Sequence, residues 1–189
     1  MLNVVSGFGH EAGQALALHP DVEVITFTGS TRTGKQLLKD AGDSNMKRVW
    51  LEAGGKSANI VFADCPDLQQ AVRATAGGIF YNQGQVCIAG TRLLIEESIA
   101  DEFPARLKAE AQHWQPGNPL DPDTTMGMLI DNTHADNVHS LIRGGESQST
   151  LFLDGRKTRG LPPLARPFSL TSTRHQPSAG KRSSARCWW

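Results

Sequence analysis

Cysteine is scarce in this chain, and its pattern excludes two classes of protein. The three cysteines, Cys65, Cys87 and Cys187, are spread over 189 residues and form no C-x-x-C pair. This spacing argues against a disulfide-stabilised scaffold and against a zinc site. The six histidines show no metal-ligand spacing either. We therefore expect no bound metal, and a cytoplasmic protein whose thiols stay reduced.

Long apolar runs are also missing. No segment approaches the roughly 20 apolar residues that a membrane-spanning helix needs. The first residues, MLNVVSGFGHEAG, lack the basic start and the apolar centre of a signal peptide. Hydrophobic residues make up 39% of the chain, a fraction that suits a globular protein of one domain or pieces of two. We expect no membrane among its partners.

Acidic residues are absent from the last part of the sequence. Of the 19 basic and 19 acidic residues, seven basic and no acidic ones lie from Lys157 onward, so residues 1–156 carry a net charge of −7. Four prolines interrupt residues 157–189, which show neither a helix nor a strand period, and we expect this tail to be disordered. A basic arm for nucleic acid is the alternative. Because the tail has no binding motif and the rest of the chain is acidic, we expect no nucleic-acid partner.

Strand and helix patterns alternate along residues 22–153. The first strand, Val22 to Phe27, is rich in β-branched residues and leads through a turn to a helix that Ser30 or Thr31 can cap. A later helix contains Pro104, where we expect a kink. Alternating strands and helices predict an α/β fold. The expected strands cover residues 22–27, 48–51, 57–62, 91–96 and 149–153, and the expected helices cover 31–41, 68–81, 98–113 and 131–143.

The stretch FTGSTRTGKQ, residues 27–36, nearly matches a nucleotide-triphosphate loop. Gly29, Gly34 and Lys35 fit the spacing G-x-x-x-x-G-K-[ST], but Gln36 replaces the hydroxyl residue that would hold magnesium. A strand, a glycine turn and a helix N-terminus still form an anion site that suits a dinucleotide pyrophosphate. The alternative interpretation is that this stretch is an ordinary strand–turn–helix rather than an anion site.

Two further motifs follow, and the three together resemble those of the aldehyde dehydrogenase superfamily. FTGSTRTG, LEAGGKS and FYNQGQVC occur in the family's order and at its spacing, and the likeness extends from about Asn3 to Gly155. Within the family, the sequence is most similar to bacterial γ-glutamyl-γ-aminobutyraldehyde dehydrogenases of putrescine breakdown. The resemblance implies a partial aldehyde dehydrogenase-like α/β fold. Residues 1–53 would end a Rossmann-like NAD(P)-binding domain, 54–156 would begin the catalytic domain, and 157–189 would be a non-family tail.

The same resemblance implies a reaction and a set of site residues. The reaction is oxidation of a small aldehyde to a carboxylic acid with NAD, or with NADP. Gly29, Ser30 and Gly34 would bind the cofactor; Cys87 would be the nucleophile and Glu52 the general base. Without the resemblance, a cysteine is more often a buried small hydrophobe and a glutamate at a strand end is more often solvated. Full-length members of the family are homo-oligomeric, and for this chain the oligomeric state stays open.

Cys65 matches no catalytic motif, and we interpret it as structural. It lies at an expected helix start, within the sequence Asp64-Cys65-Pro66-Asp67, where Asp64 or Asp67 can cap the helix.

The resemblance also implies missing family segments before Met1 and after the tail. One nucleotide sequence that encodes residues 180–189, GKRSSARCWW, reads EEIFGPVLV in another frame, and EEIFGP is a family motif. We therefore expect a frameshift between about Arg156 and Ala165. We also expect no aldehyde oxidation by this chain alone. The alternatives are an inactive fragment that associates with an intact subunit, and a cofactor-free hydrolase that uses Cys87 and Glu52.

Overall fold

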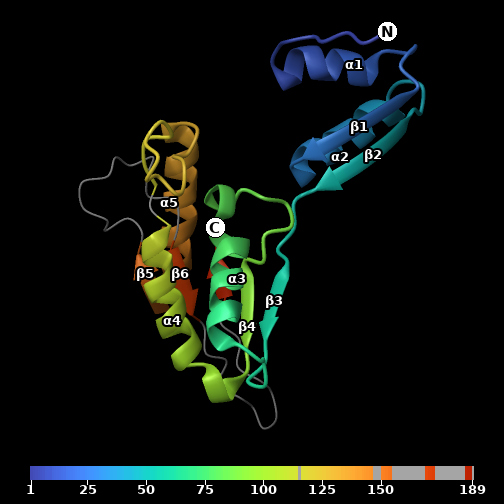
Figure 1. The fold of residues 1–189 in the computed structure, drawn as a ribbon. Helices are drawn as coiled ribbons and strands as arrows, with labels where there is room; N and C mark the ends of the chain where they lie inside the picture. The colour runs from blue at the N-terminus through green and yellow to red at the C-terminus, as the bar shows by residue number, and fades with distance from the viewer. Residues whose placement is uncertain (115, 147–149, 155–168, 173–185, 189) are drawn as a thin grey trace. The chain divides into compact units, whose positions relative to one another are not determined.

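The computed structural model describes residues 1–114, 116–146, 150–154, 169–172 and 186–188. The chain divides into two compact units, Met1–Gly55 and Lys56–Trp189, and each is described by itself (Figure 1). The division lies two residues after the boundary that the sequence predicts at residue 53. Parallel strands joined by helices occur in both units, which confirms the expected α/β class.

The first unit is a strand–helix–strand motif preceded by a short helical segment. Ser30 caps the central helix by accepting a hydrogen bond from the Thr33 N–H, so the predicted cap is confirmed at the first of its two candidates. The elements are η1 (Gly9–Gly13, a π-helix), α1 (Gln14–Leu18), β1 (Val24–Gly29), α2 (Thr31–Gly42) and β2 (Arg48–Ala53).

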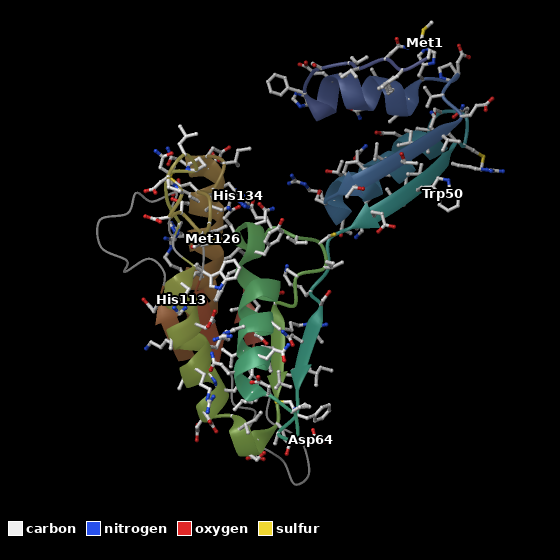
Figure 2. The ribbon with its side chains drawn as sticks, in the orientation of Figure 1. Met1, Trp50, Asp64, His113, Met126 and His134 are labelled. Atoms are coloured by element: carbon white, nitrogen blue, oxygen red, sulfur yellow. The ribbon has the colours of Figure 1, made fainter. Side chains whose placement is uncertain are left out.

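Strands β1 and β2 are parallel and in continuous register. The pairing runs from Val24 opposite Arg48 to Gly29 opposite Ala53, so both strands end at the same edge. Helix α2 connects them, as parallel pairing requires. Trp50 projects from β2 and is 64% exposed (Figure 2).

A buried lysine holds the start of this unit together. The Lys47 ammonium donates hydrogen bonds to the backbone oxygens of Ala17 (2.5 Å) and His19 (3.1 Å) and to the Ser44 hydroxyl (2.8 Å). These carbonyls lie at the C-terminal end of α1, where the helix dipole favours a cation. Lys47 is only 7% exposed, and its three hydrogen bonds give this buried polar group the partners that burial requires.

The second unit begins with another pair of parallel strands joined by a helix. Asp67 caps that helix through a hydrogen bond from the Gln70 N–H (2.9 Å), so the cap is the second of the two predicted candidates, Asp64 and Asp67. The elements up to residue 146 are β3 (Ala58–Val61), α3 (Leu68–Phe80), η2 (Tyr81–Gly84), β4 (Arg92–Ile95), η3 (Glu97–Ile99), α4 (Glu102–Glu110), η4 (Ala111–His113) and α5 (Asn132–Glu146).

The hydrophobic core of this unit lies between the β3–β4 pair and helices α3 and α4 (Figure 1). Phe80 is fully buried and lies 6.1 Å from the Trp114 ring, centroid to centroid. The buried members are Val61, Val72, Ala76, Ile79, Phe80, Leu93, Ile95, Phe103, Leu107, Ala111 and Met126.

The helix around Pro104 differs from its prediction. The predicted start at Ser98 is wrong, because Ser98 lies in η3 and α4 begins at Glu102. Pro104 is then the third helical residue. The first N–H groups of a helix have no intrahelical acceptor, so proline removes no hydrogen bond there and no kink is required.

Three strands follow α5 and form an antiparallel sheet in the order β5–β6–β7. They are β5 (Thr150–Asp154), β6 (Ser169–Ser172) and β7 (Arg186–Trp188). Strands β6 and β7 fall within residues 157–189, where the sequence predicts disorder, so the structure differs from that expectation at these strands. They are too short to show a period in the sequence, and they are fixed by pairing with distant residues, Thr150 opposite Ser172 and Leu170 opposite Cys187. The remainder of the tail lies outside the described residues.

No helix within the described ranges is long and apolar enough to cross a membrane.

Candidate active site

The predicted cofactor turn lies where β1 meets α2. Two oxygens of Ser30 accept hydrogen bonds from backbone N–H groups of α2. The hydroxyl accepts from the Thr33 N–H (3.1 Å), and the carbonyl accepts from the Gly34 N–H (3.0 Å). The N–H groups of Thr31 and Arg32 have no hydrogen-bond acceptor among the described residues. Together with the positive end of the α2 dipole, these two donors form a site that fits an anionic phosphate group.

The two glycines of the turn have different surroundings. A side chain on Gly29 would meet the Phe27 ring at 2.5 Å, so that ring lies over the end of β1. Gly34 is buried, and a Cβ there would lie 3.1 Å from the Leu51 Cδ1 on β2. The structure thus gives Gly34 a packing role, in which a missing side chain lets α2 approach the strand.

The residue that departs from the nucleotide-triphosphate pattern is engaged elsewhere. Gln36 donates a hydrogen bond from its side-chain nitrogen to the Asp40 carboxylate (2.8 Å), one turn further along α2. Asp40 is 3% exposed, so this bond satisfies a carboxylate oxygen in a buried position. The Gln36 amide therefore stabilises α2.

Glu52 lies at the same sheet edge as the turn. It pairs with Thr28 across the β1–β2 ladder, one residue before Gly29 pairs with Ala53. Residue 52 is exposed, and Gly54 and Gly55 follow after Ala53. The structure therefore brings Glu52 together with three of the other predicted site residues, Gly29, Ser30 and Gly34, in the first unit.

Cys87 belongs to the second unit and lies on an exposed turn. The Ala89 N–H donates to the Val86 oxygen (3.0 Å), which makes Cys87 and Ile88 the two central residues of a β-turn. The thiol is free, and its residue is exposed. The N–H groups of Cys87 and Ile88 have no acceptor within the described part of the chain, so both are available to a ligand.

The loop that carries Cys87 is attached to α3 at its far end. The Gly90 N–H donates to the Gly78 oxygen (3.2 Å), a carbonyl in the last turn of α3. Such carbonyls lack intrahelical partners. The bond returns the chain from the Cys87 turn to the helix before β4 begins.

Cys65 has the surroundings of a structural residue. Its side chain is partly buried and packs against the core cluster, and its N–H donates to the Phe62 oxygen (3.3 Å). The described ranges contain no group of three His, Cys, Asp or Glu residues that could hold a metal ion.

Two features of this region were not predicted from the sequence. Asn82 and Gln83 have left-handed backbone conformations, with φ of 50° and 55°, just before Gly84 at 72°. An asparagine near a glycine is a weak signal for such a turn. Thr91 is 2% exposed, and its buried hydroxyl has no hydrogen-bond partner among the described residues, a feature that no sequence pattern signals.

Comparison with known proteins places these motifs in one family. The model of the aldehyde dehydrogenase family matches residues 1–173. The chain is 81% identical over 156 residues to the NADP/NAD-dependent aldehyde dehydrogenase PuuC of Escherichia coli (strain K12), covering 82% of this chain and 32% of PuuC. It therefore spans about a third of the length of that relative.

Solved structures agree with this match. The aldehyde dehydrogenase KauB from Pseudomonas aeruginosa is 49% identical with a TM-score of 0.82, over 88% of this chain and 34% of KauB. The γ-glutamyl-γ-aminobutyraldehyde dehydrogenase from Burkholderia cenocepacia J2315 is 43% identical with a TM-score of 0.80, over 87% of this chain and 34% of that enzyme. The partial fold expected from the three motifs is thereby confirmed, and the chain belongs to the aldehyde dehydrogenase family.

Proposed function

We propose that this chain carries the nucleophile and the general base of an enzyme that oxidises an aldehyde to a carboxylic acid with NAD or NADP. The observation that carries the proposal is the position of Cys87, a free exposed thiol on a turn whose two central N–H groups have no acceptor among the described residues. A nucleophile beside free backbone donors suits acyl chemistry, because the donors stabilise the oxyanion that addition creates.

Cys87 attacks the aldehyde carbon in the first step. A carbon–sulfur bond forms, the thiol proton passes to solvent or a base, and the carbonyl electron pair moves to oxygen. The Cys87 N–H can donate to that oxygen. The cofactor, when bound, supplies the acceptor for the hydride that leaves the same carbon. A thioester on Cys87 results, and thiolate is a good leaving group from it.

Glu52 acts on the water that cleaves the thioester. It takes a proton as the water adds to the carbonyl carbon, and the carbon–sulfur bond then breaks to regenerate the Cys87 thiolate. The exposed carboxylate at the end of β2 can accept that proton, and Gly54 and Gly55 give its backbone freedom to reorient.

The turn before α2 would hold the cofactor's pyrophosphate. The free N–H groups of Thr31 and Arg32 and the helix dipole provide the attraction, while the Ser30 cap fixes the helix start. Gly34 contributes by letting α2 approach β2. The name of the Escherichia coli relative includes both NADP and NAD, so both cofactors are candidates.

The proposed substrate is γ-glutamyl-γ-aminobutyraldehyde, an intermediate of putrescine catabolism. The similarity to the Burkholderia cenocepacia enzyme of that name supports this choice. We further propose that the whole protein is cytoplasmic and homo-oligomeric. Since the chain spans about a third of its relatives, turnover is proposed for the whole protein, and the 189-residue chain alone is expected to show none.

A chimera tests the proposal. Residues 1–154 of this chain replace the matching segment of the Escherichia coli relative, and formation of reduced cofactor is measured with the proposed aldehyde. The chimera should turn over. Cys87→Ser should lower kcat by at least about 10³-fold, as loss of a nucleophile does elsewhere, and Glu52→Gln by about 10²-fold.

Cys65→Ser is the matched control and should keep the chimera's turnover, because Cys65 packs against the core. Turnover that survives Cys87→Ser would refute the assignment of the nucleophile.

A further inference from the structure

The backbone a few residues before Cys87 is strained. Asn82, Gln83 and Gly84 are three consecutive residues with φ between 50° and 72°. Glycine adopts this left-handed conformation freely. For asparagine the conformation is slightly unfavourable in free energy, and for glutamine it is more unfavourable. Two non-glycine residues in this region persist only where neighbouring contacts hold them.

A set of amide hydrogen bonds supplies part of that support. The Gln85 N–H donates to the Asn82 carbonyl (3.0 Å), and the Asn82 side-chain nitrogen donates to the Gln85 carbonyl (3.3 Å). The Gln85 side chain then donates to the Gln83 side-chain oxygen (2.9 Å). Backbone and side chains of the turn therefore stabilise the same conformation.

Gln83 also contacts a segment that is distant in the sequence. Its side-chain nitrogen lies 3.1 Å from the position that a Cβ on Gly127 would occupy. Gly127 follows Met126, which is 4% exposed and belongs to the core cluster; Met126 is labelled in Figure 2. The Met126 oxygen accepts a hydrogen bond from the Gly117 N–H (3.0 Å). Gln83 therefore contacts a segment that is itself held by this hydrogen bond and by the core.

Within the described residues, the Cys87 loop is held on both of its sides. On one side, the left-handed residues reverse the chain after α3. On the other, Gly90 is hydrogen-bonded to Gly78 of the same helix. Between these points lies the β-turn of Cys87, whose thiol and free N–H belong to the same residue. The directions of the Cys87 thiol and of the Cys87 N–H therefore depend on the direction in which the left-handed turn leads the chain.

We propose that Asn82 and Gln83 are positioning residues for Cys87, Asn82 through its left-handed backbone and Gln83 through its contacts with Gln85 and Gly127. Their role is to orient the Cys87 turn so that its N–H faces the oxygen of a substrate that the thiol attacks. This inference rests on the proposed role of Cys87 as nucleophile.

The test compares two reactions of the same thiol in the full 189-residue chain. Acylation by p-nitrophenyl acetate forms a carbon–sulfur bond and releases p-nitrophenolate, and the thiol proton goes to solvent. It passes through an oxyanion that backbone N–H groups stabilise. Alkylation by iodoacetamide releases iodide and forms no oxyanion. The ratio of the two rates at Cys87, measured on its peptide by mass spectrometry, therefore reports orientation rather than exposure.

Asn82→Val disfavours the left-handed conformation, and Asn82→Gly permits it. We expect Asn82→Val to lower acylation of Cys87 about tenfold, less than the roughly hundredfold loss of a complete oxyanion donor, with alkylation within about twofold. Asn82→Gly should recover most of the acylation rate. Cys65 in the same samples is the internal reference for both reagents.

A second variant keeps the test decisive if Asn82→Val unfolds the chain. Gln83→Ala leaves Asn82 in place and removes the Gln83 side-chain amide, with its contacts to Gln85 and Gly127. It should lower acylation severalfold, while Gln70→Ala on the exposed face of α3 changes neither rate. Circular dichroism checks that each variant is folded.

Three results would overturn the proposal. They are wild-type acylation rates in both Asn82→Val and Gln83→Ala, an equal fall of acylation and alkylation, and a wild-type Cys87 whose ratio does not exceed that of Cys65. Failure of the proposed function is a different observation, namely a chimera whose turnover survives Cys87→Ser.

Discussion

The unpartnered hydroxyl of Thr91 predicts a substitution that stabilises the protein. Thr91 is 2% exposed, and no described residue forms a hydrogen bond with its hydroxyl oxygen. Valine has nearly the same shape without the hydroxyl. Burying a hydroxyl without a partner costs about 1–3 kcal/mol in protein mutational data, so Thr91→Val should raise the free energy of unfolding by about 1 kcal/mol.

Thr75 provides the matched control. It is equally buried, at 1% exposed, but its hydroxyl accepts a hydrogen bond from the Asn59 side chain (3.2 Å). Thr75→Val removes that acceptor and should lower the free energy of unfolding by about 1 kcal/mol. The same chemical change should therefore have opposite signs at two positions in the second unit.

Urea unfolding followed by circular dichroism measures both effects. The midpoints should separate by the equivalent of about 2 kcal/mol, with similar dependence on urea concentration. A Thr91→Val variant that is less stable than the parent by as much as Thr75→Val would refute the reasoning, because it would mean that the Thr91 hydroxyl has a partner.

Three further predictions concern the backbone, the packing and the gene. Met46 has φ 57° and is 84% exposed, so Met46→Val should lower the free energy of unfolding by more than about 1 kcal/mol while Met46→Gly does not lower it; thermal unfolding compares the two. Gly34→Ala should cost about 1 kcal/mol more when Leu51 is present than in a Leu51→Ala background, because the added Cβ lies 3.1 Å from the leucine; a double-mutant cycle measures that coupling. The coding DNA should continue with family sequence in another frame beyond about Arg156. Codons for residues 180–189 that do not give EEIFGPVLV in any frame would contradict the frameshift.

The sequence predicted the strand–helix alternation well, because each element carries its own local signal. Ser30 and Asp67 are capping residues at the starts of α2 and α3, and both form the expected hydrogen bonds. The predicted start of α4 was wrong, since Ser98 has the residue type of a cap but lies inside the 3-10 turn η3, which has no side-chain cap hydrogen bond. A cap is recognised by its side chain, whereas a helix start also depends on what the following residues pack against.

The motifs predict residues for the candidate site but not the contacts of those residues. Glu52, Cys87 and the glycine turn remain predictions that rest on three motifs. That a Cβ on Gly34 would meet Leu51 depends on how α2 packs on β2, and that Gln83 lies on Gly127 joins residues far apart in the chain. Such contacts leave no periodic trace in a sequence. Pairing of β6 and β7 with distant partners is unpredictable for the same reason.

The most direct measurement of the central claim is the mass of the acyl group on Cys87. In the chimera that carries Glu52→Gln, deacylation should be slow, so the thioester should accumulate after aldehyde and cofactor are mixed. We predict that the Cys87 peptide gains the mass of the aldehyde less two hydrogens, only when the cofactor is present, and that the Cys65 peptide does not. An unmodified Cys87 in a sample that still forms reduced cofactor would contradict the account.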